Sequence, residues 1–411
     1  MDIKPILATL RRHKFTAFLL VMQIALTCAI VCNAIFLIGQ RLDRMHMPTG
    51  MAEHELVFVQ LAYIGGRPDA MARTAADLAA LKSIPGAKSV ALANELPFSG
   101  SSSSMGVREN AQHDHDTLIA SQYYGENLLP TLGVRLIEGR DFQPDEYRDL
   151  SDVFAALHRG DVNALPKPLL ITKAIAERLW PGQDALGKQV YVGQGITLTV
   201  VGVVQDLSRG GRINVRQGEQ YSVIHPIRMA MSTGALYVIR CAPADREQIL
   251  KAALARLKAL DARRIVLDKG TWDDMRHDYF RDDRAMAGIL VGVCIALLVI
   301  TALGIVGLAS FWVSQRNRSI GVRRALGATR HNILRYFLTE NFLLTTIGIV
   351  LGMVLAYGIN LFLIVHYELP RMPAIYLPAG AMLLWCLGQI AVLGPALRAA
   401  AVPPVVATRS V

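Results

Sequence analysis

Four long apolar stretches constrain this chain more than any other feature of its sequence. They cover residues 15–38, 285–313, 337–365 and 376–397. A helix needs about 20 apolar residues to cross the hydrocarbon core of a membrane, so each stretch is long enough to span it. The first stretch exceeds the apolar region of a signal peptide and shows no small-residue cleavage site, so we expect it to be retained.

The composition agrees with a chain that lies partly in lipid. Only 18% of the residues are charged and 52% are hydrophobic, whereas soluble domains average about 25% charged residues. The net charge of +10 is carried largely by residues that flank the apolar stretches, where Lys and Arg set topology and meet anionic headgroups. We therefore expect lipid, and not nucleic acid, to neutralise these cations.

Residues 41–284 separate the first apolar stretch from the second and have ordinary polarity. The pattern predicts strands over 54–64, 89–93, 169–172, 189–192, 196–204, 221–227, 235–240 and 264–267, and helices over 69–82, 173–179 and 244–260. Gly193-Gln194-Gly195 predicts a hairpin turn. A polar helix over 272–283 is expected to continue into the second span as a stalk. The predicted fold class is a membrane protein with four transmembrane α-helices and a large α+β extracytoplasmic domain inserted between helices 1 and 2.

Charge placement predicts the topology of the chain. Four Lys or Arg lie in residues 1–14 and six in residues 314–335, but only Arg371 lies in 366–375. Because cytoplasmic segments are rich in Lys and Arg, both termini and 314–335 are expected in the cytoplasm. The expected location is the cell inner (plasma) membrane, with several spans and a periplasmic large domain.

The predicted segments follow from these observations. Residues 1–14 form a cytoplasmic amphipathic helix, since Ile3, Ile6, Leu7 and Leu10 share one face. The remaining segments are a transmembrane helix over 15–39, the extracytoplasmic domain and stalk over 41–284, a second transmembrane helix over 285–314, a cytoplasmic coupling loop or helix over 315–335, transmembrane helices over 337–365 and 376–397, and a cytoplasmic tail over 398–411.

Three motifs resemble nucleotide-binding, metal-binding or catalytic sites, but their sequence context does not support these functions. Gly182–Gln189 begins like a P-loop, but Gln follows the Lys and a predicted helix precedes it, so we expect a structural turn. His113–Asp116 is expected to be a solvated loop or an adventitious metal site. Ser101–Ser104 lacks the elbow context of a nucleophile. We therefore predict no catalytic residue, no metal site and no cofactor on this chain.

Cysteines and small residues are expected to serve packing. Four of the five cysteines lie in apolar stretches, so the soluble region, with Cys241 alone, can form no internal disulfide. Gly348, Gly352 and Ala356 form a ridge of small residues that favours close helix contact. Glu340 and Asn341 are expected at the membrane interface or in a polar contact with another helix.

Residues 315–330 form a basic segment between the second and third spans. One interpretation is that its arginines only fix cytoplasmic orientation. The other is a short coupling helix that docks on a soluble partner and passes force from it into the membrane. Gly321 and Gly327 favour the second interpretation, because orientation requires no glycine, whereas close docking and a helix C-cap do.

These features together resemble the FtsX/MacB-type permeases of ABC transporters. The resemblance rests on the four spans, on Ser319–Ala328, and on three further segments, Tyr123–Phe142, Leu170–Asp206 and Pro395–Val405. This chain has Gln315 and Ser319 where the family often has acidic residues. We expect it to lack the fused ATPase domain that MacB-type proteins carry.

The resemblance implies a permease subunit that does not hydrolyse ATP itself. ATP would bind to a separate cytoplasmic ABC ATPase subunit, and the permease would pair with a second copy or a paralogue, with a periplasmic adaptor as a possible further partner. The ATPase-coupling residues would be Arg316, Arg318, Ile320, Gly321, Arg323, Arg324, Ala325, Leu326, Gly327 and Ala328. The expected function is export, efflux or mechanotransmission across the envelope. The alternative is a regulatory or sensory FtsX-like protein that controls an envelope enzyme.

Overall fold

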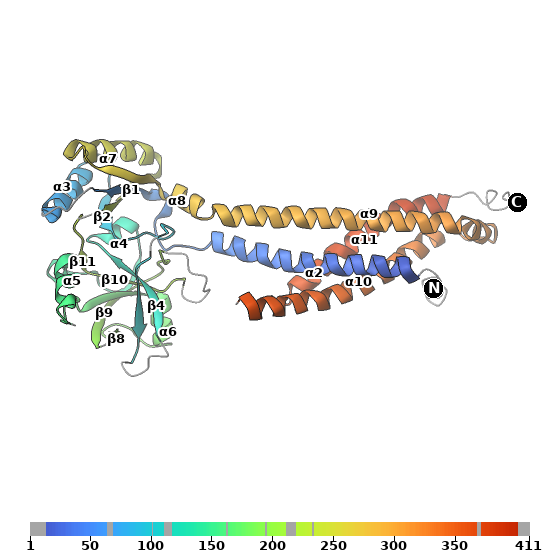
Figure 1. The fold of residues 1–411 in the computed structure, drawn as a ribbon, viewed down its shortest axis with the longest axis horizontal. Coiled ribbons are helices and arrows are strands. Elements are labelled where there is room, and N and C mark those ends of the chain that lie inside the picture. Colours follow the sequence, from blue (N-terminus) through green and yellow to red (C-terminus); the bar gives the residue numbers. More distant parts are fainter. Residues whose placement is uncertain are drawn as a thin grey trace. The chain divides into compact units, whose positions relative to one another are not determined.

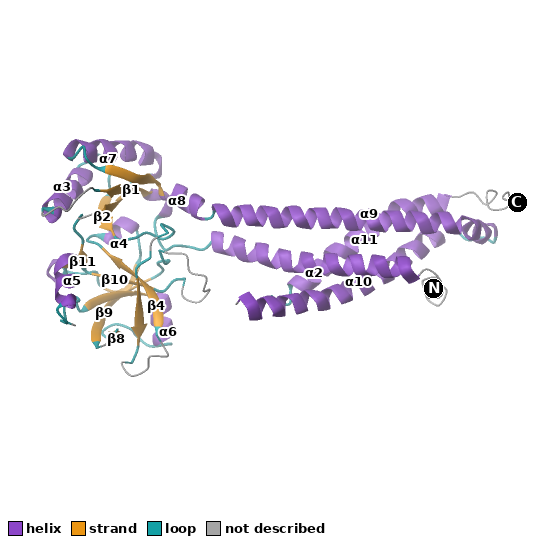
Figure 2. Cartoon of the chain, in the orientation of Figure 1, coloured by secondary structure: helices purple, strands orange, loops and turns teal. Residues whose placement is uncertain are grey.

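The computed structural model describes residues 14–63, 69–100, 102–110, 117–161, 163–193, 195–210, 219–231, 234–367 and 371–401. The chain divides into two compact units. The membrane unit contains the chain up to His46 and from Asp282 onward, and the soluble unit contains Met47–Arg281. Among the described residues, the strands belong to the soluble unit (Figure 2).

Four helices make up the described part of the membrane unit (Figure 1). They are α2 (Lys14–Met45), α9 (Arg281–Ala325), α10 (Arg330–Tyr367) and α11 (Tyr376–Ala401). Each is long and apolar enough to cross a membrane. The four predicted spans are therefore confirmed, although every helix extends beyond the apolar stretch that predicted it.

Glycines allow α10 and α11 to approach α2 closely. A Cβ atom added to Gly348 would lie 2.8 Å from Cβ of Ile24, and one added to Gly352 would lie 2.4 Å from Cβ of Cys28. The predicted ridge of small residues therefore packs against α2. Gly380 of α11 makes a similar approach to Cys32, where an added Cβ would lie 2.4 Å from the sulfur.

Polar contacts also join the membrane helices. The hydroxyls of Thr27 on α2 and Thr301 on α9 lie 2.8 Å apart. The side-chain amide of Asn341 donates to the carbonyl of Gly388 on α11 at 2.9 Å, so Asn341 makes the predicted contact with another helix. At the other end of α9, Arg41 of α2 forms an ion pair with Asp283. Inside an apolar environment such groups need partners, and these contacts provide them.

The first sheet of the soluble unit has the strand order β13-β1-β12-β2. Its strands are β1 (Leu56–Ala62), β2 (Ser89–Ala93), β12 (Gly234–Arg240) and β13 (Ile265–Thr271), all antiparallel to their neighbours. Helices α3 (Ala70–Lys82) and α7 (Arg246–Leu260) cover one face (Figure 1). Val57, Val59 and Tyr237 point toward these helices and form a buried core with Leu81 and Ile249.

The second sheet has the order β5-β9-β7-β10-β4-β3-β8. Its strands are β3 (Ser104–Arg108), β4 (Leu118–Tyr124), β5 (Leu136–Gly139), β7 (Pro168–Thr172), β8 (Gln189–Val192), β9 (Ile196–Val204) and β10 (Ser222–His225). Strand β8 pairs with both β3 and β9, so six of the strands close into a ring. Leu169, Ile171 and Leu198 are buried in its core.

Shorter elements complete the soluble unit. They are α4 (Leu128–Leu132), β6 (Arg148–Asp149), α5 (Leu150–His158), α6 (Lys173–Leu179), β11 (Ile227–Arg228) and α8 (Trp272–Tyr279). Together with the two sheets they confirm the predicted α+β class. The predicted hairpin is present as the antiparallel pair β8–β9.

Two local predictions are wrong. The helix expected over 272–283 is interrupted, because α8 ends at Tyr279 and α9 begins at Arg281. Between them, Phe280 leaves helical geometry (φ −91°, ψ 12°) and becomes buried against Phe98. No strand is predicted between residues 94 and 168, yet Ser104–Arg108 forms β3, whose residues pair with β4. In both places a tertiary contact overrides the local pattern.

Candidate functional site

The basic segment 315–330 lies where α9 turns back into α10. No separate short helix is present, because α9 continues without interruption to Ala325. The prediction of a short coupling helix is wrong in this respect, since no residue between Gln315 and Ala325 stops the helix. We call residues 322–330 the hairpin tip.

Gly327 ends α9 in a Schellman motif. Its φ of +96° is accessible to glycine and costly for other residues. The amide of Ala328 donates to the carbonyl of Arg323 at 3.0 Å, and the amide of Gly327 donates to that of Arg324 at 3.1 Å. These are the two hydrogen bonds that define the motif. The sequence signal for a C-cap in this segment was therefore correct.

Several of the predicted coupling residues support the hairpin from inside. Ile320 is 5% exposed and packs against Ile333 and Phe337 of α10 and Ala396 and Ala399 of α11. Gly321 is buried on the same side of the helix. These two residues hold the base of the hairpin together and are not available to a partner.

Arg316 is also engaged in contacts within this chain. Its guanidinium makes a bidentate ion pair with the carboxylate of Glu340 on α10, with the shortest distance at 2.8 Å. Its carbon atom Cζ lies 5.8 Å from the ring of Trp312, a cation–π distance. Glu340 thus forms the contact with another helix that its position in the third span predicted.

The hairpin tip presents an apolar and basic surface. Leu326 is 82% exposed and Val322 is 48% exposed. Arg323 and Ala325 are also exposed, whereas Arg324 and Ala328 are half-buried. The guanidinium of Arg323 lies 5.3 Å from the ring of Tyr336, which restrains it. The side chain of Arg318 is not among those described. Leu326 can enter an apolar groove on a partner, and the arginines can pair with acidic groups around it.

The soluble unit contains a second notable site, around Phe98. This residue has a φ of +66°, which is unusual for a bulky side chain. Its ring contacts those of Trp272, Tyr279 and Phe280, with centroids 4.8–5.6 Å apart. The side chain of Arg276 lies over both Phe98 and Trp272. The loop that carries Phe98 is thereby attached to α8, immediately before α9 begins.

Glu95 closes the base of that loop. Its carboxylate accepts a hydrogen bond from the amide of Ser103 at 2.5 Å, and the residue is 1% exposed. Burial raises the pKa of Glu95 to about 7, although the Ser103 amide, Ser121 and the charge of Arg209 oppose this rise. Sequence reasoning missed both Glu95 and Phe98. A buried acid and a left-handed Phe leave no local pattern that could reveal them.

The motifs considered for catalysis or metal binding have these positions. Gly182–Gln189 follows helix α6 and ends at the first residue of strand β8, the reverse of the strand-to-helix order of a P-loop. His113–Asp116 and Ser101 lie outside the described residues. Within the described part of the chain, no group of three or more His, Cys, Asp or Glu side chains could hold a metal ion.

Two family models match the sequence. The model of the MacB-like periplasmic core domain matches residues 18–257, which is more than half of the chain. The model of the FtsX-like permease C-terminal domain matches residues 291–404. The chain belongs to the MacB/FtsX-type ABC transporter permeases. It is therefore a membrane protein with a periplasmic domain.

Relatives of this permease include a permease of Bacillus subtilis and longer ATP-binding/permease proteins. It is 25% identical over 322 residues to the ABC transporter permease YvrN of Bacillus subtilis, covering 74% of each chain. It is 25% identical to the macrolide export ATP-binding/permease protein MacB 1/2 of Paracoccus denitrificans, covering 86% of this chain but only 50% of that one. The periplasmic region of MacB from Actinobacillus actinomycetemcomitans matches 57% of the chain at 14% identity, with a TM-score of 0.32.

Proposed function

We propose that this permease couples ATP hydrolysis by a separate cytoplasmic ATPase subunit to movements of its periplasmic domain, for export or mechanotransmission across the envelope. The observation that carries the proposal is the course of α9. This one helix begins at Arg281, the last residue of the soluble unit, and ends at the hairpin tip, where Leu326 is exposed. A force applied at the tip would act on the residue that follows Phe280.

The ten coupling residues divide into two roles in this proposal. Arg316, Ile320 and Gly321 stiffen the hairpin through contacts with α10 and α11. The tip residues would meet the ATPase, and they are Arg323, Arg324, Ala325, Leu326, Gly327 and Ala328. Arg318 would join them. An apolar side chain surrounded by cations suits a groove with an acidic rim, since such an arrangement supplies both contact area and orientation.

The remaining parts of the proposal concern partners and orientation. The tip, together with both chain termini, would lie in the cytoplasm, where Arg-rich segments are retained. ATP would be bound by the ATPase alone, and this chain would bind no cofactor. A second permease copy or a paralogue would complete the assembly, and a periplasmic adaptor would contact the soluble unit.

The test starts from the full chain purified from native membranes with the ATPase that accompanies it. ATPase activity is then measured in lipid nanodiscs with Leu326→Asp and with Arg323→Glu/Arg324→Glu. We expect both variants to insert and fold but to lose most of the stimulation of the ATPase. Arg178→Glu, an exposed arginine on α6, is the matched control and should keep it. Unchanged stimulation in both tip variants would contradict the coupling role. Purification of a hydrolase, with no ATPase present, would favour the regulatory alternative.

A further inference from the structure

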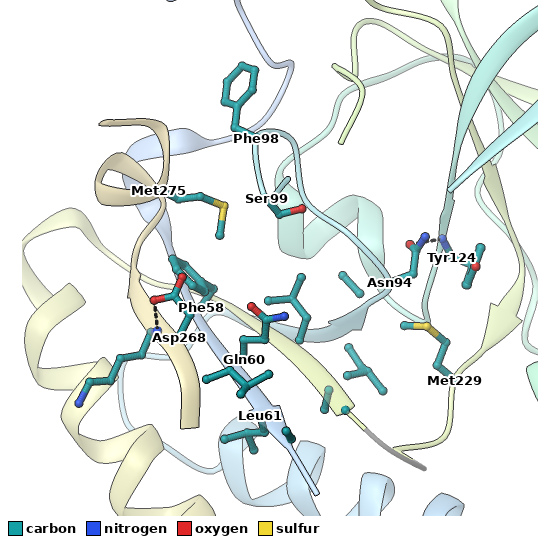
Figure 3. Close-up of a pocket in the computed structure, with 18 of the residues that line it drawn as sticks. Phe58, Gln60, Leu61, Asn94, Phe98, Ser99, Tyr124, Met229, Asp268 and Met275 are labelled. Atoms are coloured by element: carbon teal, nitrogen blue, oxygen red, sulfur yellow. Dashed lines mark hydrogen bonds between the residues drawn. The ribbon is translucent and has the colours of Figure 1, made fainter. Parts of the chain in front are cut away.

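The soluble unit contains a cavity of about 640 Å³ that no part of the proposed coupling uses (Figure 3). It lies against the face of the first sheet that α3 and α7 leave free. Phe58 and Gln60 of β1 and Leu236 of β12 point to that face, since they alternate with the core residues Val59 and Tyr237. Its volume falls in the range of about 300–1,000 Å³ that is common for small-molecule sites.

The wall of the cavity combines polar and apolar groups, and its apolar part is adaptable. Phe58 and Leu236 supply the sheet side, and Phe98 and Tyr279 of the neighbouring aromatic cluster also line the cavity. In Figure 3, Met275 from α8 and Met229 extend toward the space from opposite sides. Methionine side chains are flexible and polarizable, so they fit apolar ligands of irregular shape.

The charges of the lining residues are mostly negative. Asp268 of β13 and Asp274 and Asp278 of α8 line the cavity, opposed by Lys269 alone among the described lining residues. Asp274 accepts hydrogen bonds from the amide and the hydroxyl of Thr271 and so caps α8. Asp268 accepts one from the amide of Lys269, while Asp278 is 80% exposed. Exposed carboxylates of this kind determine which sign of charge a ligand can carry more than they add to its affinity.

We propose that this cavity binds a small amphipathic cation. Its apolar body would lie between Phe58, Leu236 and the two methionines, and its positive group would face Asp268 and Asp278. Such a ligand would touch the first sheet, the loop that carries Phe98 and α8 together. Its influence on α9 rests on the proposed function, but its binding does not.

The binding test uses the full chain in nanodiscs without any ATPase, so it is independent of coupling. The probe is rhodamine 6G, an amphipathic cationic dye, followed by fluorescence polarization, with empty nanodiscs measured to subtract lipid partitioning. We expect a saturable component that weakens as salt is raised. Asp268→Asn/Asp278→Asn should weaken it about tenfold, the combined effect of two exposed charges.

Two further variants make the test specific. Met229→Trp fills the cavity and should remove the saturable component, whereas Glu177→Gln removes one exposed charge on α6, outside the cavity, and should leave it unchanged. The carboxamide variants keep the shape of the site, so they remain informative if Met229→Trp fails to fold. The proposal is overturned by the absence of saturable binding above empty nanodiscs, or by unchanged affinity in the carboxamide variant.

Discussion

Arg316 on α9 and Glu340 on α10 form a bidentate ion pair in which the carboxylate is only 2% exposed. Breaking such a pair leaves a buried charge without a partner, which costs about 3–5 kcal/mol. We therefore predict that Arg316→Ala lowers the thermal stability of the membrane unit strongly. The measurement is the unfolding midpoint of the full chain in nanodiscs.

Replacing both partners is the control for this ion pair. Arg316→Met/Glu340→Leu should recover most of the lost stability, because apolar residues of similar volume often replace a buried pair without loss. Equal destabilisation by the single and the double variant would mean that packing, and not charge, makes these positions important.

The contact of Gly352 with α2 gives a second prediction. A Cβ atom at this position would lie 2.4 Å from Cβ of Cys28 and 2.7 Å from the carbonyl oxygen of Ala25. Gly352→Ala should therefore force the helices apart and cost about 1–3 kcal/mol, as overpacking does. The matched control is Gly358→Ala on the same helix, where an added Cβ meets nothing within 4 Å. Equal unfolding midpoints for the two variants would refute the close contact.

Glu95 predicts a pH dependence of stability. Burial raises the pKa of Glu95 to about 7 from its ordinary value of 4.5, so between these pH values the native state binds a proton that the unfolded state has lost. The stability that comes from the protonated carboxyl is fully present below about pH 4.5 and is lost as the pH rises through about 7. We expect the free energy of unfolding of the soluble unit to fall by up to roughly 3 kcal/mol over this window. The measurement is the unfolding midpoint as a function of pH, which should fall with it.

Glu95→Gln should flatten that pH profile, because the carboxamide cannot ionise. The control is Glu109→Gln, which removes an exposed carboxylate from the same unit. It should leave the wild-type dependence of the unfolding midpoint on pH unchanged. A Glu95→Gln protein whose midpoint still falls between pH 5 and pH 8 would assign the titration to another group.

Phe98 gives a fourth prediction. Phe98→Ala removes three ring contacts at the end of α8 and should cost about 3–5 kcal/mol, in the range of buried Phe deletions. The emission of Trp272 should shift to longer wavelength as water reaches its ring. Phe154→Ala, at a site that is 49% exposed on α5, should change neither property. A Trp272 spectrum unaffected by Phe98→Ala would show that the cluster does not depend on this ring.

The sequence predicted those parts of the fold that depend on local pattern. β2 and α6 have the predicted bounds, because their apolar residues repeat at the period of a strand and of a helix. The sequence did not predict β3, β4 and β5, because the residues around them in the sequence are polar. These strands form by pairing with strands that are distant in the sequence. The ring of strands closes where Val107 pairs with Val192, and no local pattern encodes that register.

The candidate site was predicted in part for the same reason. The basic segment, its C-cap glycine and its position between two spans could be derived from composition and spacing. Which residues of this segment are buried and which are exposed could not be derived, because this depends on which face of α9 meets α10 and α11. Ile320 and Leu326 are both apolar residues of one segment, yet one is 5% and the other 82% exposed.

The continuity of α9 fixes the rotation of its two ends as well as their separation. Asp283 near one end contacts Arg41, and Arg316 toward the other contacts Glu340. Each residue added between them would turn one contact about 100° around the helix axis relative to the other. A single alanine inserted between Asp283 and Arg316 would therefore turn the two ion pairs out of register, although the helix itself would remain intact.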